Sequence, residues 1–142
     1  MGVMPGRPEV FLLRESERKV APGGPALVGA DGERDEVPPR VYEVLRFVEE
    51  VLRSGYGVQI TPLRTELPID EAADAIEMDR EELRLYAGRG DISFRSSQYV
   101  DWVQLADVLD LNARVNAERE QALRGLSAEE PWGDDSGRSG RQ

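Results

Sequence analysis

The sequence predicts a mainly α-helical fold with a small β component. Three observations support this class: an apolar stripe with three- and four-residue steps between residues 41 and 52, two short helical patterns in succession before residue 88, and a longer helical pattern over residues 105–126. Two short β-type runs lie between the second and third of these patterns. At 142 residues, the chain has room for one domain plus tails.

The composition excludes several kinds of chemistry. The chain has no cysteine and no histidine, which removes disulfides, thiol nucleophiles, the usual Cys/His zinc sites and histidine acid–base catalysis. The carboxylates lie on expected solvent faces, so we expect no enzyme, no metal site and no cofactor. A net charge of −10 disfavours general binding to phosphate backbones. Without a long apolar run or a signal-peptide pattern, we expect a cytoplasmic protein that does not contact membranes.

The first third of the chain changes character at a pair of prolines. Residues 1–37 are predicted to be a disordered leader rich in glycine and proline, with one apolar patch at Val10–Leu13. Pro38 and Pro39 then begin a helix, which a glycine at residue 55 ends. The run YGVQITPL, Tyr56–Leu63, has alternating β-type character. Residues 38–66 are therefore predicted to form a helix plus strand extension.

A winged helix-turn-helix is predicted over residues 67–109. In its first helix, Ala72, Ala73 and Ile76 are expected to face inward. Asp79 is a good N-cap for the second helix, and Glu82 three residues later completes a capping-box pattern.

Two strands, Asp91–Phe94 and Tyr99–Val103, are expected to form the wing around the polar loop RSSQ. Trp102 is expected to face the core, whereas Tyr99 fits either a buried position or an exposed protein-binding position. A long C-terminal helix over residues 105–126 and a flexible tail over residues 127–142 complete the chain.

The motifs in this region resemble the excisionase-like winged helix-turn-helix, a relative of the MerR DNA-binding domain. The resemblance is carried by EAAD (residues 71–74), MDR (78–80), Leu83, GDISF (90–94) and LADVL (105–109). Together with the helix PPRVYEVLRFVEEVL, the strand GVQITPL and the charged helix ending in QALRGL, the layout is similar to that of bacterial antitoxins partnered with PIN-domain ribonuclease toxins. It covers residues 38–126.

The sequence departs from this family at the starts of the two short helices and in the wing. Pro68 stands where the family has a small polar N-cap, with Asp70 as a substitute, and Asp79 replaces the usual serine. In the wing, the family has a glycine and several basic residues. Residues 98–102 of this sequence, Gln98 to Trp102, contain no basic residue. Residues 67–109 hold ten acids and four bases.

The candidate DNA-binding residues are Arg80, Arg84 and Arg95, because arginine is the usual bidentate partner of guanine and also binds phosphate. In the alternative interpretation each arginine pairs with a neighbouring carboxylate, for example Arg80 with Asp79 and Arg84 with Glu81.

The resemblance implies that the segment after the domain wraps a toxin. The candidate partner-binding residues are Leu123, Leu126 and Trp132, with Arg124, Arg138 or Arg141 approaching toxin carboxylates. An unstructured solubilising end is the alternative. The expected function is an antitoxin-like protein that binds and neutralises a PIN-type ribonuclease toxin, with weak or no operator DNA binding, acting as a monomer or a homodimer. The alternatives are a stand-alone DNA-binding regulator or excisionase-like factor, and a winged-helix protein-interaction module that has lost DNA binding.

Overall fold

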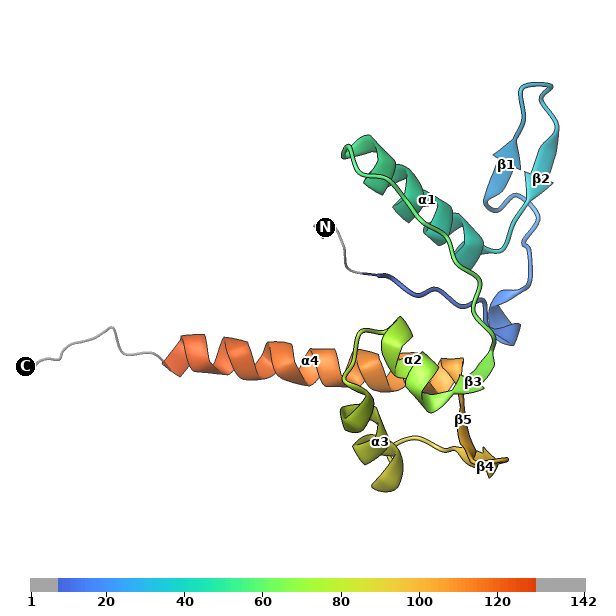
Figure 1. Ribbon diagram of the computed structural model, residues 1–142. Coiled ribbons are helices and arrows are strands. Elements are labelled where there is room, and N and C mark those ends of the chain that lie inside the picture. The colour runs from blue at the N-terminus through green and yellow to red at the C-terminus, as the bar shows by residue number, and fades with distance from the viewer. Residues whose placement is uncertain (1–7, 130–142) are drawn as a thin grey trace, which may run out of the picture.

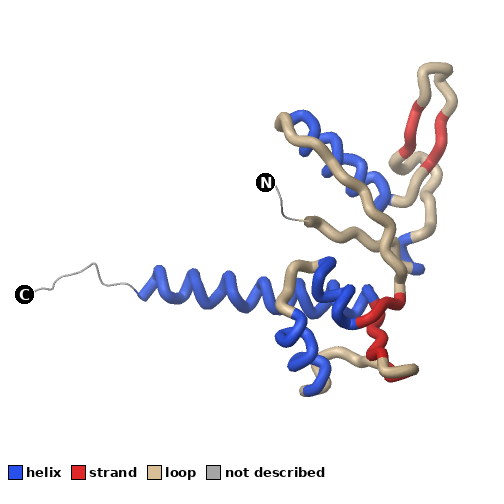
Figure 2. The backbone as a smooth tube through the Cα atoms, viewed as in Figure 1, coloured by secondary structure: helices blue, strands red, loops and turns tan. Residues whose placement is uncertain are grey.

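The structure, a computed structural model, describes residues 8–129 (Figure 1). Over this range the protein has four α-helices, one short 3-10 helix and five short strands (Figure 2), which confirms the predicted mainly α-helical class with a small β component. In chain order the elements are η1 (Glu15–Glu17), β1 (Ala26–Val28), β2 (Arg34–Glu36), α1 (Pro39–Arg53), β3 (Glu66–Pro68), α2 (Ile69–Ala75), α3 (Arg80–Gly88), β4 (Arg95–Ser97), β5 (Val100–Gln104) and α4 (Leu105–Glu129).

One hydrophobic core lies between α2, α3, the sheet β3-β5-β4 and the first half of α4. This is the arrangement of a winged helix-turn-helix, with α3 in the position of the reading helix and the hairpin β4–β5 as the wing (Figure 1). Helices α2 and α3 and the three strands are too short to be stable alone, so shared apolar contacts with each other and with α4 hold them together. The buried residues of the core are Leu67, Ile69, Ala72, Ala73, Met78, Leu83, Ala87, Ile92, Val103, Leu105, Val108, Leu111 and Val115.

The central strand of the three-stranded sheet is β5, which pairs antiparallel with β3 on one side and with β4 on the other. Leu67 of β3 lies opposite Val103 of β5, and both side chains are buried. The sequence does not predict β3, because three residues that end in Pro68 are too few to show an alternating pattern. The strand joins the N-terminal extension to the wing.

The wing is a hairpin, as predicted, but its first strand is displaced along the chain. The prediction of a strand at residues 91–94 is wrong, because β4 begins at Arg95 and the residues RSS, expected in the loop, form the strand itself. Asp91 belongs to the C-terminal cap of α3, where its N–H donates to the Tyr86 carbonyl at 2.9 Å. Ile92 is then buried in the core. These two residues are already engaged before the strand begins.

The helices α2 and α3 end in the same hydrogen-bonded cap, the Schellman motif. After α2, the Met78 N–H donates to the Ala73 carbonyl at 2.9 Å, and the Glu77 N–H donates to the Asp74 carbonyl at 3.2 Å. Glu77 has a φ of 56°, in the left-handed region. After α3 the corresponding position is Gly90, with a φ of 85°. The left-handed conformation is therefore held by glycine in one cap and by a residue with a Cβ in the other.

Replacing Glu77 by glycine is expected to raise the free energy of unfolding by about 1 kcal/mol, because the left-handed region is unfavourable for a residue with a Cβ. Gly90→Ala should lower it by a similar amount through φ alone, since a Cβ at Gly90 would have no atom within 4 Å. Urea unfolding followed by far-UV circular dichroism measures both variants. A Glu77→Gly variant less stable than the wild type would contradict this account of the cap.

The N-terminal extension contains the predicted helix but not the predicted strand. Helix α1 begins at Pro39 as expected. Its apolar stripe is only partly covered: Val51 is buried, whereas Leu45 and Leu52 are exposed. The prediction of a strand at Tyr56–Leu63 is wrong, because within residues 8–129 no strand pairs with the backbone of this segment.

The prediction of a disordered leader is wrong for residues 8–37. The ring of Phe11 packs edge-on against Phe47 of α1, with 5.4 Å between centroids. Arg14 forms an ion pair with Asp110 of α4 at 2.8 Å. The strands β1 and β2 then form an antiparallel hairpin that stands beyond α1 (Figure 1). The leader is ordered by contacts with distant elements, which its composition does not reveal.

Helix α4 begins at Leu105 as predicted and continues to Glu129, three residues into the segment expected to be a flexible tail. Its first half packs on the core. Every residue from 116 to 126 is exposed, and in Figure 1 this half of the helix projects from the rest of the protein as a single rod. The rest of the expected tail, residues 130–142, lies outside the described residues.

Candidate nucleic-acid interface

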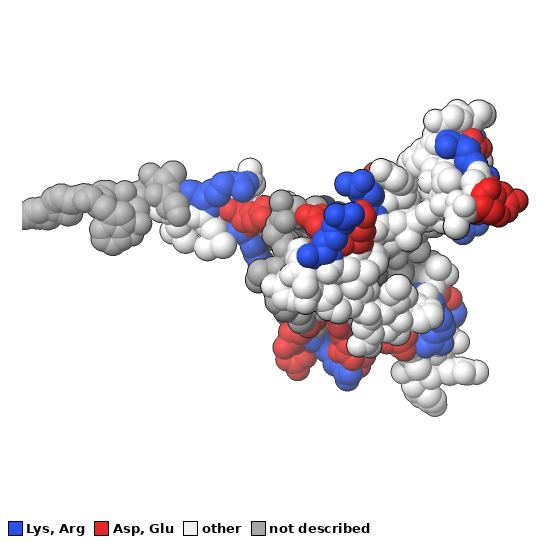
Figure 3. Space-filling view, turned by 90° about the horizontal axis from the view of Figure 1, so that it is seen from above, with Lys and Arg blue, Asp and Glu red and all other residues white. Residues whose placement is uncertain are grey.

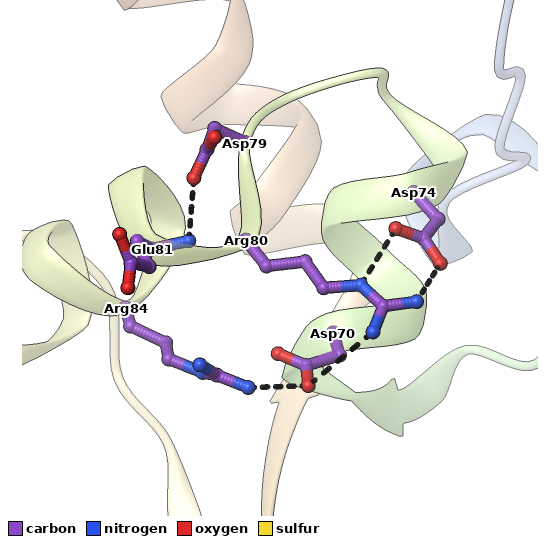
Figure 4. Close-up of polar contacts among 6 residues, drawn as sticks. All are labelled: Asp70, Asp74, Asp79, Arg80, Glu81 and Arg84. Atoms are coloured by element: carbon purple, nitrogen blue, oxygen red, sulfur yellow. Dashed lines mark hydrogen bonds and ion pairs between the residues drawn. The ribbon is translucent and has the colours of Figure 1, made fainter.

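Helix α3, the candidate reading helix, begins with the cap that the sequence predicts. The Asp79 side chain accepts a hydrogen bond from the Glu81 N–H at 2.8 Å (Figure 4). The second half of the expected capping box is not observed. Glu82 instead accepts a hydrogen bond from Arg119 of α4 at 2.6 Å. Glu82, which was expected to complete the capping box, therefore connects α3 to α4.

Arg80, the first candidate DNA-binding residue, is held by α2. Its Nε and Nη2 donate to the two carboxylate oxygens of Asp74 at 3.0 and 2.6 Å (Figure 4). The carboxylate of Asp70 lies 3.9 Å from its Nη1. A bidentate contact of this kind is the one that arginine makes with a guanine edge or a phosphate. A carboxylate of the same chain therefore occupies the donors that would contact DNA.

Arg84, one turn further along α3, is held in the same way. Its Nη2 donates to Oδ2 of Asp70, so Asp70 contacts both arginines (Figure 4). The other oxygen of Asp70 is buried and has no hydrogen-bond partner within the described residues. Asp70 does not replace the missing N-cap of α2, which has no side-chain cap at all. The carboxylate is directed toward α3 instead.

Arg95, the candidate on the wing, is paired across the sheet. Glu66 of β3 accepts hydrogen bonds from its Nε at 2.7 Å and from its Nη2 at 2.8 Å. Because β5 lies between β3 and β4, this ion pair spans the central strand. The Arg95 guanidinium also lies over the ring of Trp102, 5.4 Å from its centroid. Trp102 is half-buried, so the expectation that it faces the core is only partly met.

These ion pairs shift the protonation equilibria of their members. Hydrogen bonding from Arg95 lowers the pKa of Glu66, and this effect exceeds the opposing effect of desolvation. Hydrogen bonding from Arg80 likewise lowers the pKa of Asp74. The same contacts raise the pKa values of Arg80 and Arg95, so both arginines remain charged.

The Glu66 carboxyl is expected to titrate below its ordinary pKa of 4.5, and Arg95→Gln should move the pKa back toward that value. Because the pKa is depressed in the folded state, the stabilisation by this pair is present above pH 4.5 and is lost as the pH falls through the folded-state pKa. A carbon-detected NMR titration of the Glu66 carboxyl measures the shift. Arg89→Gln, which removes a guanidinium paired with Asp91, is the control and should leave Glu66 unchanged. A wild-type value at or above 4.5 would contradict the pairing.

The structure thus brings every candidate DNA-binding arginine into an ion pair within the chain, and the three pairs are Arg80–Asp74, Arg84–Asp70 and Arg95–Glu66. The pairing of each arginine with a carboxylate, which the alternative interpretation expected, is observed. The partners suggested for it, Asp79 and Glu81, are wrong. Asp79 is the N-cap of α3, and Glu81 lies in its first turn.

The carboxylates that pair with these arginines were not predicted from the sequence. For α3 a signal was present: Asp70 and Asp74 are four residues apart on one helix, and Arg80 and Arg84 are four residues apart on the next. Two such pairs of opposite charge on successive helices favour contact between facing turns. For Glu66 no signal existed, because its pairing depends on β3, which the sequence does not predict.

The protein surface has mixed charge. In the view from above in Figure 3, basic side chains lie next to acidic ones and form no continuous basic patch. Residues 67–109 carry ten acids and four bases. Since affinity for DNA comes largely from cations that replace counterions on phosphates, this surface offers little attraction to a duplex.

The tip of the wing is occupied by Gln98 and Tyr99, which form the turn with φ values of 52° and 67°. Turns of this kind usually use asparagine and glycine. The Tyr99 side chain is fully exposed, which decides between the two positions that the sequence left open. The wing therefore presents an uncharged aromatic residue where DNA-binding wings present basic ones.

No protein-family model, curated protein or solved structure matches the chain. The excisionase-like and antitoxin resemblance of residues 38–126 therefore stays a prediction from the sequence. Among the described residues, no group of three or more carboxylates is arranged to hold a metal ion. Between residues 8 and 129, no helix has the length and apolar character needed to cross a membrane.

The two leucines among the candidate partner-binding residues lie in the part of the chain that the structure describes. Leu123 and Leu126 lie on the projecting half of α4, and each is 65% exposed. Trp132, Arg138 and Arg141 lie outside the described residues. The structure therefore places two apolar side chains of this set on one solvent-exposed helix.

Proposed function

We propose that the protein binds another protein through the projecting half of α4 and acts in the cytoplasm as an antitoxin-like inhibitor of a PIN-type ribonuclease. The proposal is carried by the exposure of residues 116–126, which include Leu123 and Leu126. Most helical stability in proteins comes from packing an apolar face. The residues of this part of α4 are all exposed, and the ion pair between Arg119 and Glu82 joins it to α3. Two leucines three residues apart on such a helix suit insertion into an apolar groove of a partner.

The class of partner comes from the resemblance alone. In the antitoxins that the sequence resembles, the segment after the winged helix covers an acidic active site of the toxin. Arg124 lies between the two leucines, and its side chain is 71% exposed. Its only carboxylate contact among the described residues is with Glu120, at 3.9 Å. An arginine so placed supports the choice of an acidic partner site, because little within α4 competes for it.

The double variant Leu123→Asp/Leu126→Asp tests the proposal. We expect it to weaken binding to the PIN-domain protein encoded beside this gene by about 100-fold or more, since burying each leucine contributes about 1.5–3 kcal/mol. Isothermal titration calorimetry measures the affinity, and a ribonuclease assay measures inhibition. The matched control is Ala117→Asp/Gln121→Asp, which adds the same charge at exposed positions of the same helix. Absence of such a neighbouring gene, or equal affinity of both variants, would overturn the proposal.

The second candidate is a DNA-binding regulator that acts alone. The observation in its favour is that the side chains of Arg80 and Arg84 are 55% and 52% exposed, so both ion pairs are open to water and to competition from phosphate. A titration of the protein with its own promoter DNA at increasing salt tests this role. No mobility shift even at low salt would exclude it.

A further inference from the structure

We propose that residues 56–63 pair as an antiparallel β-strand with the same residues of a second copy, forming a two-fold dimer centred on Gln59. In the structure this segment leads from the end of α1 to β3 without forming a strand (Figure 2). Within residues 8–129, no backbone–backbone hydrogen bond involves residues 57–64. The segment therefore has the composition of a strand and an unused row of backbone donors and acceptors. The inference does not depend on the function proposed above.

The two edges of this segment differ in their backbone chemistry. Along a strand, the N–H and carbonyl of alternate residues point to opposite edges. One edge holds Gly57, Gln59 and Thr61, each of which has an N–H, whereas the other edge ends in Pro62, which has none. Proline occurs in sheets where its nitrogen faces away from a neighbouring strand. The edge with Gln59 at its centre is therefore the one suited to pairing.

The side chains are self-complementary in the same register. With Gln59 opposite Gln59 of the second copy, Val58 lies opposite Ile60, and Tyr56 lies opposite Pro62. Tyr56, Val58 and Ile60 are 40%, 39% and 80% exposed, so each has area left to bury. Cross-strand pairs of β-branched and aromatic residues are the ones that stabilise antiparallel strands. Each copy would cover the apolar residues of the other.

Charge identifies the second copy as the occupant. Residues 54–63 contain no charged side chain, although charged residues make up 32% of the sequence. Exposed strand edges are normally protected by charged residues, and this one has none. In the proposed register the nearest cation, Arg64, lies opposite Ser54, so two chains of net charge −10 meet here without a facing like-charge pair. A foreign strand would not require this self-complementary order.

The molar mass of the full chain in solution is the first test. Analytical ultracentrifugation of the wild type should give a dimer, and Ile60→Lys should give a monomer with an unchanged circular dichroism spectrum, because Ile60 is 80% exposed. The control Leu85→Lys alters another exposed apolar residue, on α3, and should remain dimeric. A monomeric wild type at 100 µM, which is about the upper range for a specific weak dimer, would overturn the proposal. A dimer that persists in Ile60→Lys would also overturn it.

The absence of cysteine from the chain allows the register to be tested directly. Under mild oxidation Gln59→Cys should form a disulfide-linked dimer, since opposite residues of paired strands lie within disulfide reach. Thr61→Cys is the matched control, because Thr61 lies opposite Gly57 and not opposite its own copy, and it should stay uncrosslinked. A dimer crosslinked through Thr61→Cys but not through Gln59→Cys would overturn this register.

Discussion

Replacing Leu83 by alanine is expected to lower the free energy of unfolding by about 3 kcal/mol, within the range of 2–5 kcal/mol found for buried leucines. Leu83 lies on the inner face of α3 and is completely buried. Its side chain belongs to the core that holds α3 against the rest of the winged helix, together with Met78 and Ile92. Alanine would leave a cavity at this point, and the short helices around it have little other packing to compensate.

Leu85→Ala is the matched control, since Leu85 lies on the same helix and is 64% exposed. We expect its effect to stay within about 0.5 kcal/mol, as for most surface substitutions. Urea unfolding of both variants, followed by tryptophan fluorescence and circular dichroism, gives the comparison. Equal effects of the two substitutions would contradict the position assigned to α3, because they would mean that its buried and exposed faces are not distinguished.

Releasing the arginines of α3 from their carboxylates is expected to increase the affinity for DNA. The double variant Asp70→Asn/Asp74→Asn removes both acids that hold Arg80 and Arg84. Two additional phosphate contacts would make the slope of log K for DNA binding against log salt concentration more negative by about 1.8. A fourfold increase in salt concentration would then reduce the affinity of the variant by a factor about twelve times larger than the factor for the wild type. At low salt the variant should bind nonspecific duplex DNA about tenfold more tightly or better.

The control for this experiment is Glu77→Gln/Glu81→Gln, which makes the same change in net charge. No ion pair joins either of these acids to Arg80 or Arg84 in the described part of the chain. Fluorescence anisotropy with a labelled duplex over a salt series measures both variants. If the control gains as much affinity as Asp70→Asn/Asp74→Asn, net charge and not the release of the arginines is responsible.

The elements that the sequence predicts correctly are those with signals inside the element itself. Pro39 starts α1 because proline fits the first turn of a helix. Asp79 starts α3 because its side chain reaches an N–H two residues ahead. The inward positions of Ala72 and Ala73 follow from helical spacing on a short apolar face. Each of these features needs only the residues within one or two turns.

The elements that the sequence predicts incorrectly depend on distant partners. The segment Tyr56–Leu63 has the composition of a strand, but a strand exists only where a second one pairs with it. Phe11 lies in a leader whose composition gives no sign of structure, and its position is set by the contact with Phe47 of α1. At the candidate site, the identity of the arginines could be read from the sequence, whereas the bond between Arg95 and Glu66 required the register of three strands.

The length of α4 sets a distance between two surfaces of the protein. At 1.5 Å per residue, Leu126 lies about 16 Å along the helix axis from Val115, the last buried residue of α4. A molecule that grips the end of the rod therefore has no need to touch the wing or the arginines of α3. Both surfaces could be occupied at once. A substitution at one surface would then change the affinity for the ligand of that surface and not for the ligand of the other. If the proposed binding at α4 and DNA binding at α3 both occur, the helix would act as a spacer that keeps the two apart.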